Sequence, residues 1–479
     1  MMAAVLWVVL PGLLGAPVLA ALPGWRLAAV GNIVVCGVSF LAACHLALAG
    51  SGGAMAGAAR PDALAVVMVL LTSFTGLTTA WFSRFYIADA AAAGRLGPRA
   101  LRLYHGGFAG LLGLLLCALL SDNIGLTWIF LELAGFVELL VVMLPASRAA
   151  FAAGWRMLVL CGVALLAALF GTALLAVAAG PAALSWPGLA AAAPAGNGML
   201  LDLAFVFLLI GYGTKAGLVP LHHWLADAQA EGPTPVSAIL SGLSLNVALV
   251  VLLQLRALIG LNEAAGGGAI LSGPALMLLG LVSVVVASFS LWPQRDVKRL
   301  FAFSTIEQNG ICALAFGLGG AAAIVAGLLH MILHTLGRAA IFQSAGLAAQ
   351  LRGGDGFRQL QGLLRGQRLL ALTLLAGAIA VAGLPPFGLF SSEFLLLGAL
   401  ARGPWWLILP LLPGLVVGAV ALLSRVLRLC LDEPPAGRPA VVAGPLMLAG
   451  AWINLALLLL LGLAMPAAVL AWLRLAAGA

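Results

Sequence analysis

The sequence predicts an all-α, polytopic membrane protein of about fourteen transmembrane helices, and two observations carry this prediction. First, 64% of the 479 residues are hydrophobic and only 8% are charged, whereas soluble domains average roughly 25% charged residues. No soluble fold could bury so much apolar surface, so the solvent must be lipid. Second, the apolar residues fall into runs of about 20, the length that crosses a bilayer as a helix.

The run length places each expected helix along the chain. The spans lie at 3–22, 27–49, 62–82, 104–121, 123–144, 156–179, 199–219, 235–255, 272–292, 299–318, 321–349, 369–400, 405–427 and 441–471. The first resembles a signal peptide but lacks a positive n-region, so we interpret it as a membrane helix. The runs 321–349, 369–400 and 441–471 exceed one simple span, which predicts tilt, interruption or a trailing interfacial helix.

The basic residues predict the orientation. Most of the 23 lysines and arginines lie in odd-numbered loops, and the exceptions in the even loops and the C-terminus are Arg60, Arg256, Arg402 and Arg474. Cytoplasmic loops collect Lys and Arg, so both termini are expected outside the cytoplasm, with the chain in the inner (plasma) membrane. We expect N-terminal helices at 1–103, two repeats at 104–255 and 256–430, and a C-terminal helix at 431–479.

Several classes of function are disfavoured by what the sequence lacks. The six cysteines form no C-x-x-C pair, and no phosphate-binding loop occurs. We therefore expect no metal, no cofactor, no catalytic redox site and no ATP-driven step in this chain. The net charge of +8 does not indicate nucleic-acid binding, because the basic residues lie in short loops between apolar runs.

Ionisable residues at bilayer depth are costly and usually mark ion pathways or buried pairs. Glu132 lies about nine residues into its span, or roughly 13 Å deep. Glu138 faces about 120° away from it, so we expect Glu132 rather than Glu138 to line a path. Lys215 must be paired or deprotonated at this depth. A carboxyl hydrogen-bonded to a neighbouring helix and a fixed salt bridge are the structural alternatives for Glu132 and Lys215.

A second group lies in the spans at 299–318 and 321–349. His330, His334 and Arg338 recur every fourth residue, so they share one stripe of a helix. Imidazoles titrate near neutral pH and can pass protons along such a stripe, although a single buried histidine is more often structural. Glu307 and Gln308 lie in the preceding span, where a relay role and a structural pairing are both open.

Prolines interrupt two of the spans, near 217–220 and 384–388. Interrupted helices offer free carbonyl and N–H groups at membrane depth, and such a pair predicts two inverted five-helix repeats, each with a broken helix. A histidine pair follows the first break, and an acid that could form the outlet of the path follows the second. The residues concerned are Pro220, His222, His223, Pro385, Pro386 and Glu393.

Four segments resemble the antiporter-like proton-translocating family, which includes large membrane subunits of respiratory complex I, of multisubunit cation/proton antiporters and of membrane-bound hydrogenases. They are TKAGLVPLHHWLADAQAEGPTPVSAILSG, DVKRLFAFSTIEQNG, HMILHTLGRAAIFQSAG and AGLPPFGLFSSEF, within a similarity that runs from about 104 to 430. The resemblance implies that Glu132 pairs with Lys215 and that Glu393 is the charged residue of the second broken helix.

Three positions depart from the commoner pattern of this family. Asn246 and Arg338 stand where a lysine is usual, and Gln308 stands where a histidine is usual. Arginine effectively never deprotonates, so either the relay uses water near Arg338 or the unit conducts poorly. The asparagine variant looks most like component F of hydrogenase-4.

We therefore predict a proton-translocating membrane subunit of a hydrogenase-4 or formate-hydrogenlyase-like redox complex. Protons would pass Glu132, Lys215, His330 and His334 and leave near Glu393. The expected partners are other membrane subunits, a peripheral redox arm, lipid and protons, with Na+ as the alternative ion. The alternative functions are a subunit of a cation/proton antiporter, of a complex I-type NADH:quinone oxidoreductase or of an inorganic-carbon uptake complex, and a non-conducting scaffold.

Overall fold

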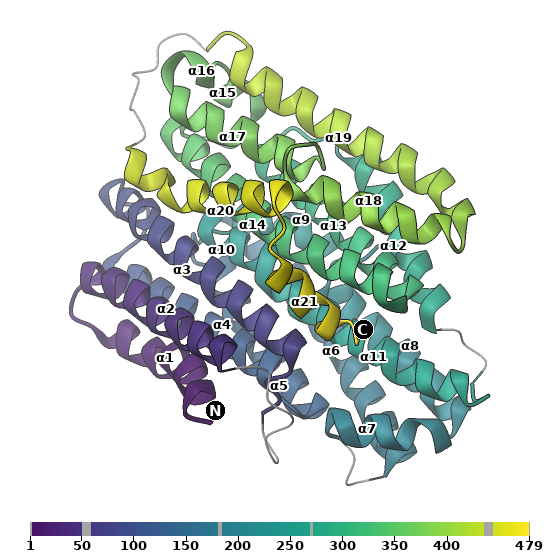
Figure 1. The fold of residues 1–479 in the computed structure, drawn as a ribbon. Helices are drawn as coiled ribbons and strands as arrows, with labels where there is room; N and C mark the ends of the chain where they lie inside the picture. The colour runs from purple at the N-terminus through teal and green to yellow at the C-terminus, as the bar shows by residue number, and fades with distance from the viewer. Residues whose placement is uncertain (1, 50–58, 181–183, 269–271, 435–443, 479) are drawn as a thin grey trace.

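A computed structural model describes residues 2–49, 59–180, 184–268, 272–434 and 444–478, and in these ranges the chain is helical, with isolated bridges in place of β-strands (Figure 1). The first third of the chain forms six long helices, each of which spans a predicted apolar run. They are α1 (Met2–Ala21), α2 (Trp25–Leu48), α3 (Ala63–Ala92), α4 (Pro98–Leu120), α5 (Ile124–Val142) and α6 (Arg148–Ala179).

The middle of the chain is divided into shorter elements around the first break. They are α7 (Trp186–Ala192), η1 (Ala193–Ala195), α8 (Gly198–Lys215), α9 (His223–Glu231), α10 (Thr234–Ile239), the π-helical η2 (Leu240–Ser244) and α11 (Leu245–Ala264). The last part contains α12 (Ser272–Ser290), α13 (Val297–Leu318), α14 (Gly320–Arg352), α15 (Phe357–Leu360), α16 (Leu363–Gly366), α17 (Arg368–Val381), α18 (Gly388–Ala401), η3 (Trp405–Leu407), α19 (Ile408–Leu431), α20 (Pro445–Leu463) and α21 (Ala467–Ala476).

The described residues contain twelve helices that are long and apolar enough to cross a membrane. The more polar α13, with 22 residues, and the interrupted pair α17 and α18 account for the two other predicted runs. The three long runs have different outcomes: α14 is one continuous helix of 33 residues, 369–400 is interrupted, and α20 is followed by the short α21. Residues 441–443 of the last run lie outside the described residues.

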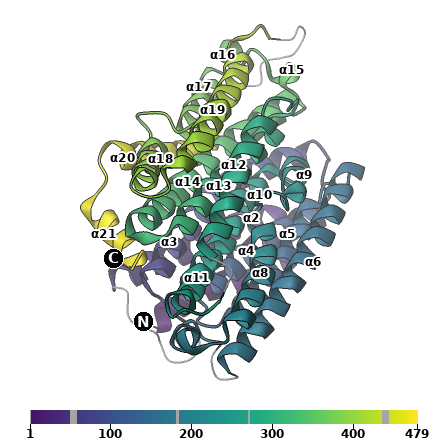
Figure 2. The ribbon, with the colours of Figure 1, turned by 90° about the vertical axis from the view of Figure 1, so that its right-hand side faces the viewer.

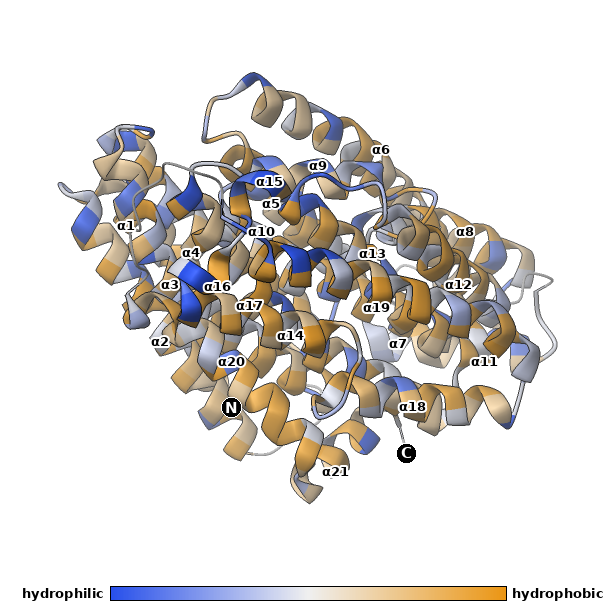
Figure 3. Ribbon diagram, turned by 90° about the horizontal axis from the view of Figure 1, so that it is seen from above, coloured by the Kyte–Doolittle hydropathy of each residue, from blue (hydrophilic) through white to orange (hydrophobic). Residues whose placement is uncertain are grey.

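Hydropathy follows the arrangement expected for a protein surrounded by lipid. Hydrophobic residues cover most of the ribbon in Figure 3, and hydrophilic residues gather near α9, α15 and α16. On α6, Val163 and Leu166 are 64% and 61% exposed, so this helix presents an apolar face to the outside. Figure 2 shows α5, α6 and α8 on one side of the molecule, α17, α18 and α19 on the other, and α13 and α14 between them.

The two helix breaks have the same local structure. Both contain the pattern Ala-Gly-Leu-x-Pro, at 216–220 and at 382–386. The glycines, Gly217 and Gly383, have φ of +73° and +67°, a region that residues with a Cβ rarely adopt. The peptide bonds before Pro220 and Pro386 are both cis. The predicted breaks are therefore present, and they are two copies of one motif.

A second pair of matching features lies at opposite ends of the molecule. Asn123 caps α5 by accepting from the N–H groups two and three residues ahead, and Asp296 caps α13 in the same way. Asn123 bridges to Ser185 at the start of α7, and Asp296 bridges to Gly356 at the start of α15. Figure 1 shows α7 and α15 at opposite ends of the bundle. Matching structures at opposite ends are what inverted repeats produce.

Candidate functional site

Lys215, the last residue of α8, forms a fully buried ion pair with Glu138 of α5. Its Nζ lies 2.6 Å from Oε2 of Glu138, and both side chains have no exposed surface. The same Nζ lies 5.7 Å from the ring centroid of Trp224, whose indole N–H donates to the Thr214 carbonyl. Removing one partner of a buried pair costs about 3–5 kcal/mol, because the other charge is left without compensation.

The expected Glu132–Lys215 pair is wrong, because the structure places Glu138 beside the lysine. Glu132 is partly exposed and lines a small cavity of about 20 Å³ between α5 and α6. Its neighbours Leu133 and Phe136 are 46% and 47% exposed, so this part of α5 faces outward. The depth of the two carboxylates alone could not tell which of them faces α8.

Arg338 of α14 donates to acceptors on two other helical segments, η2 and α13, and on its own helix. Its Nη1 donates to the Ser241 carbonyl, Nη2 donates to the Thr305 carbonyl (3.0 Å) and to Oδ1 of Asn309 (2.8 Å), and Nε donates to Nε2 of His334 (2.8 Å). All of these acceptors are neutral. Within the described ranges, none of the ion pairs includes Arg338.

The hydrogen bonds assign the protonation of the two histidines. Because Nε2 of His334 accepts from Arg338, His334 is neutral and carries its proton on Nδ1. Oγ of Ser392 donates to the Leu389 carbonyl at 2.7 Å, so Nδ1 of His330, 2.9 Å from that Oγ, is the donor to serine. Nε2 of His330 is then an acceptor, with no partner among the described residues.

These contacts form one polar row between the two helix breaks. Nδ2 of Asn309 donates to the carbonyl of Ala216, the residue after Lys215, at 2.8 Å. From Asn309 the row continues through Arg338 to His334, whose ring centroid lies 5.9 Å from that of His330. His330 contacts Ser392 on α18, after the second break. We refer to Ala216, Asn309, Arg338, His334, His330 and Ser392 as the polar row.

The sequence did not lead us to select Asn309, although this residue lies in the family-like segment DVKRLFAFSTIEQNG. Asn309 lies four residues after Thr305, so both lie on the face of α13 that meets Arg338. The four-residue spacing from Thr305 is the sequence signal that could have identified Asn309 as a member of the same helix face. The predicted stripe of His330, His334 and Arg338 is present, and it is this stripe that joins α13 to α18.

Two acids lie near the second break. Oε1 of Glu307 accepts from Oγ of Ser288 at 2.8 Å, and Glu307, Gln308 and Glu393 line a cavity of about 10 Å³ with Val381. This volume is near the minimum for one water molecule. Nε2 of Gln308 lies 3.5 Å from the Val381 carbonyl, the outer limit of a hydrogen bond.

The other predicted residues lie outside the polar row. Asn246 of α11 donates from Nδ2 to Oγ1 of Thr335 at 2.7 Å, next to the row. His222 is buried and His223 is exposed, with ring centroids 4.4 Å apart, and His222 packs near Phe303 of α13.

A network of charges that sequence reasoning did not predict fixes α9 at one end of the molecule. The carboxylate of Asp227 pairs with Arg156 of α6 and with Arg299 of α13. Beside it, Nζ of Lys298 lies 3.3 Å from the carboxylate of Asp355. The helix after the first break is thereby attached to two neighbouring helices by charge.

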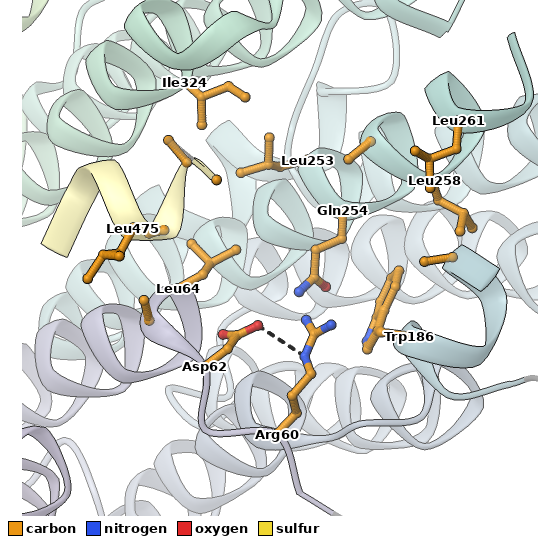
Figure 4. A pocket seen from close by; sticks show the side chains of 16 residues that line it. Arg60, Asp62, Leu64, Trp186, Leu253, Gln254, Leu258, Leu261, Ile324 and Leu475 are labelled. Atoms are coloured by element: carbon orange, nitrogen blue, oxygen red, sulfur yellow. Dashed lines mark ion pairs between the residues drawn. The ribbon is translucent and has the colours of Figure 1, made fainter. Parts of the chain in front are cut away.

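At the other end, a cavity of about 390 Å³ lies between α3, α7, α11, α14 and α21 (Figure 4). Nε of Arg60 lies 3.1 Å from the carboxylate of Asp62, and its guanidinium carbon lies 5.8 Å from the ring centroid of Trp186. Leucines such as Leu253 and Leu258 line much of the remainder. The arginine of this cavity is therefore already neutralised by an acid.

Comparisons with known proteins agree on one family. The family described as NADH:quinone oxidoreductase/Mrp antiporter, TM matches residues 121–418. The hydrogenase-4 component F homolog of Methylacidiphilum infernorum is 44% identical over 380 residues, 78% of this chain and 79% of that protein. NADH-quinone oxidoreductase subunit N of Desulforudis audaxviator is 30% identical over 353 residues, 72% of this chain and 67% of that protein. In fold, the chain is similar to one in an archaeal membrane-bound sulfane sulfur reductase, with a TM-score of 0.86 at 21% identity, covering 100% and 97% of the two chains.

Proposed function

Because the chain belongs to the NADH:quinone oxidoreductase/Mrp antiporter transmembrane family, we propose that it is a proton-translocating membrane subunit of a multisubunit redox complex of the hydrogenase-4 type. The observation that carries this proposal is the polar row, which begins beside the Lys215–Glu138 pair and ends on the helix that bears Glu393. The 44% identity to a hydrogenase-4 component F homolog favours this type of complex.

The Lys215–Glu138 pair would be the switch of the path. When Nζ is held at the carboxylate, the two charges compensate each other in a fully buried site. Moving them apart leaves two uncompensated buried charges. Uptake of a proton by Glu138 from the cytoplasmic side, together with release of the Lys215 proton toward the polar row, would remove that cost. The break directly after Lys215 allows α8 and α9 to change their relative positions without stretching a continuous helix.

The histidines would carry the proton past Arg338. A guanidinium does not lose its proton, so Arg338 would serve as a fixed positive charge. Nε2 of His330 is an open acceptor, and its Nδ1–H already donates to Ser392, so a proton taken up on one side of this ring can leave from the other. Glu393 follows Ser392 and lines the cavity shared with Glu307, which supports an outlet beside the second break.

Glu132 would contribute to an interface with another membrane subunit. A partly exposed carboxyl at mid-membrane, beside the exposed Leu133 and Phe136, cannot be satisfied by lipid. A neighbouring subunit that supplies a donor on this face of α5 and α6 would satisfy it. A peripheral redox arm would bind at the end that carries α9, α15 and α16, with both termini at the opposite, non-cytoplasmic side of the inner membrane.

The matched breaks and caps also support the division into repeats at 104–255 and 256–430. Each repeat would contain one Ala-Gly-Leu-x-Pro break and one polar helix cap. The two caps would lie at opposite ends of the bundle. The polar row runs between the two breaks, so a movement at one break would be transmitted to the other through α13 and α14.

Proton uptake by proteoliposomes that contain the whole complex tests this function, with redox turnover recorded in parallel. Glu138→Gln and Lys215→Met should each abolish most uptake in an assembled complex. Glu132→Gln makes the same chemical change on the same helix and is the matched control, expected to keep the switch working. Full uptake by Glu138→Gln would remove the pair from the path, and uptake that requires Na+ would indicate an antiporter subunit.

One observation favours a second candidate, a non-conducting scaffold. Arg338 is held by neutral acceptors and cannot release its proton, and Asn246 and Gln308 cannot carry a proton as an ionisable side chain would. A scaffold predicts that complexes with changes at His330 or Lys215 pump as well as the unaltered complex.

A further inference from the structure

A groove of about 620 Å³ lies between α14, α18, α20 and α21, apart from the polar row. Its walls are mostly apolar and include Val325, Phe390, Phe394, Leu461 and Leu470. In Figures 1 and 2, α21 lies below α18 and α20, on the same face of the bundle. The groove is large enough for part of an acyl chain, since ligand cavities are commonly about 300–1,000 Å³.

The groove opens toward the lipid. Phe394 and Phe390 are 65% and 44% exposed, so its wall on α18 has no cover from the described chain. The ten residues of α21 reach only about 15 Å, too short to span a bilayer. A short amphipathic helix of this kind lies in the interfacial plane, where lipid headgroups are found. One end of the groove is therefore at headgroup depth and the other among acyl chains.

Two arginines stand at this groove, Arg402 after α18 and Arg474 on α21. Both are exposed, and within the described part of the chain neither takes part in an ion pair. Nε of Arg402 donates only to the carbonyl of Gly398 on its own helix, at 3.1 Å. Two positive charges on one groove repel each other unless an anion lies between them. Both also belong to the few basic residues outside the odd-numbered loops.

We propose that this groove binds an anionic phospholipid, with its phosphate between Arg402 and Arg474 and an acyl chain along Phe390 and Phe394. Guanidinium groups bind phosphate oxygens through paired hydrogen bonds, which matches this arrangement. The cavity around Arg60 makes the contrast clear, because Asp62 already neutralises that arginine and leaves no net charge for an anion.

Native mass spectrometry of the full chain in detergent tests the proposal with phosphatidylglycerol and phosphatidylethanolamine as probes. The unaltered chain should retain phosphatidylglycerol at least tenfold more strongly. Each of Arg402→Gln and Arg474→Gln should lower retention of phosphatidylglycerol about tenfold, since one hydrogen bond to a charged group contributes about that factor. Phe394→Ala should weaken both lipids alike.

Arg358→Gln is the matched control, because it removes one exposed arginine from α15, at the opposite end of the bundle. It should leave the preference unchanged. Equal retention of the two lipids by the unaltered chain, or equal losses in Arg358→Gln and Arg402→Gln, would overturn the proposal. Strong displacement of the lipid by millimolar inorganic phosphate would overturn it too, because the acyl chain would then contribute nothing.

Discussion

Replacing Asn309 by leucine is the sharpest perturbation of the polar row. Asn309 is 1% exposed and makes two hydrogen bonds, donating to the Ala216 carbonyl and accepting from Arg338. Leucine has a similar volume, so Asn309→Leu keeps the packing and removes both bonds. It leaves a carbonyl oxygen and an N–H of a guanidinium unsatisfied, which should lower the free energy of unfolding by about 2–5 kcal/mol.

The loss of proton uptake in Asn309→Leu should be larger than the loss caused by replacing any other asparagine in this region. Without Asn309, the row no longer connects the first break to Arg338, and proton uptake by the complex in proteoliposomes should fall at least tenfold. Asn246→Leu is the matched control: it removes a buried asparagine that donates to Thr335 beside the row. It should cost about 1 kcal/mol of stability and leave most uptake intact.

The assay must separate assembly from conduction. Both variants should be purified as complete complexes, with redox turnover measured at the same time as proton uptake, so that a folding loss is recognised by a lower yield. Unaltered uptake in an assembled Asn309→Leu complex would refute the polar row as a path. Equal losses in the two asparagine variants would show that any buried polar deletion in this region has the same effect.

Three further predictions concern other parts of the chain. Gly383→Ala should destabilise the second break by more than about 1 kcal/mol, seen in thermal unfolding of the complex, because φ is +67° and the new Cβ would clash with the Glu393 carboxylate. His334→Phe should stop proton uptake while Arg338→Lys keeps part of it, since lysine retains the charge; full uptake by His334→Phe would contradict the relay. A single cysteine at position 358 should resist an impermeant thiol reagent added outside and one at position 402 should react, whereas the reverse would invert the orientation.

The helices could be predicted from the sequence because a lipid environment permits few backbone conformations. A run of about 20 apolar residues in a bilayer must satisfy its backbone internally, so length and hydropathy locate each span. The breaks were predictable for the same reason, since Pro220 and Pro386 cannot continue a helix. The shared Ala-Gly-Leu-x-Pro pattern was visible in the sequence as well, and comparing the two breaks residue by residue would have revealed it.

The partner of Lys215 could not be predicted in this way. Glu132 and Glu138 lie on the same apolar helix, and the sequence around them does not distinguish an outward face from a buried one. Leu133, Phe136 and Leu140 are exposed to the outside, but in a membrane helix these residues look the same as core residues. Only the packing of α5 against α8 determines that Glu138 meets the lysine.

The charges of the interior would set the direction of proton movement along the proposed path. The Lys215–Glu138 pair is neutral as a unit, whereas Arg338 carries a charge that no acid neutralises by direct contact within the described ranges. Glu307 and Glu393 line one cavity near the second break, and two carboxylates so placed repel each other if both are ionised. One shared proton leaves them with a single negative charge, which balances Arg338. A proton that reaches His330 would add a positive charge beside Arg338, and its transfer toward Glu393 through Ser392 would move that charge away from the guanidinium. The charge balance would return when the proton leaves at the outlet. The proton would therefore move from the first break toward the second, where Glu307 and Glu393 form no ion pair among the described residues.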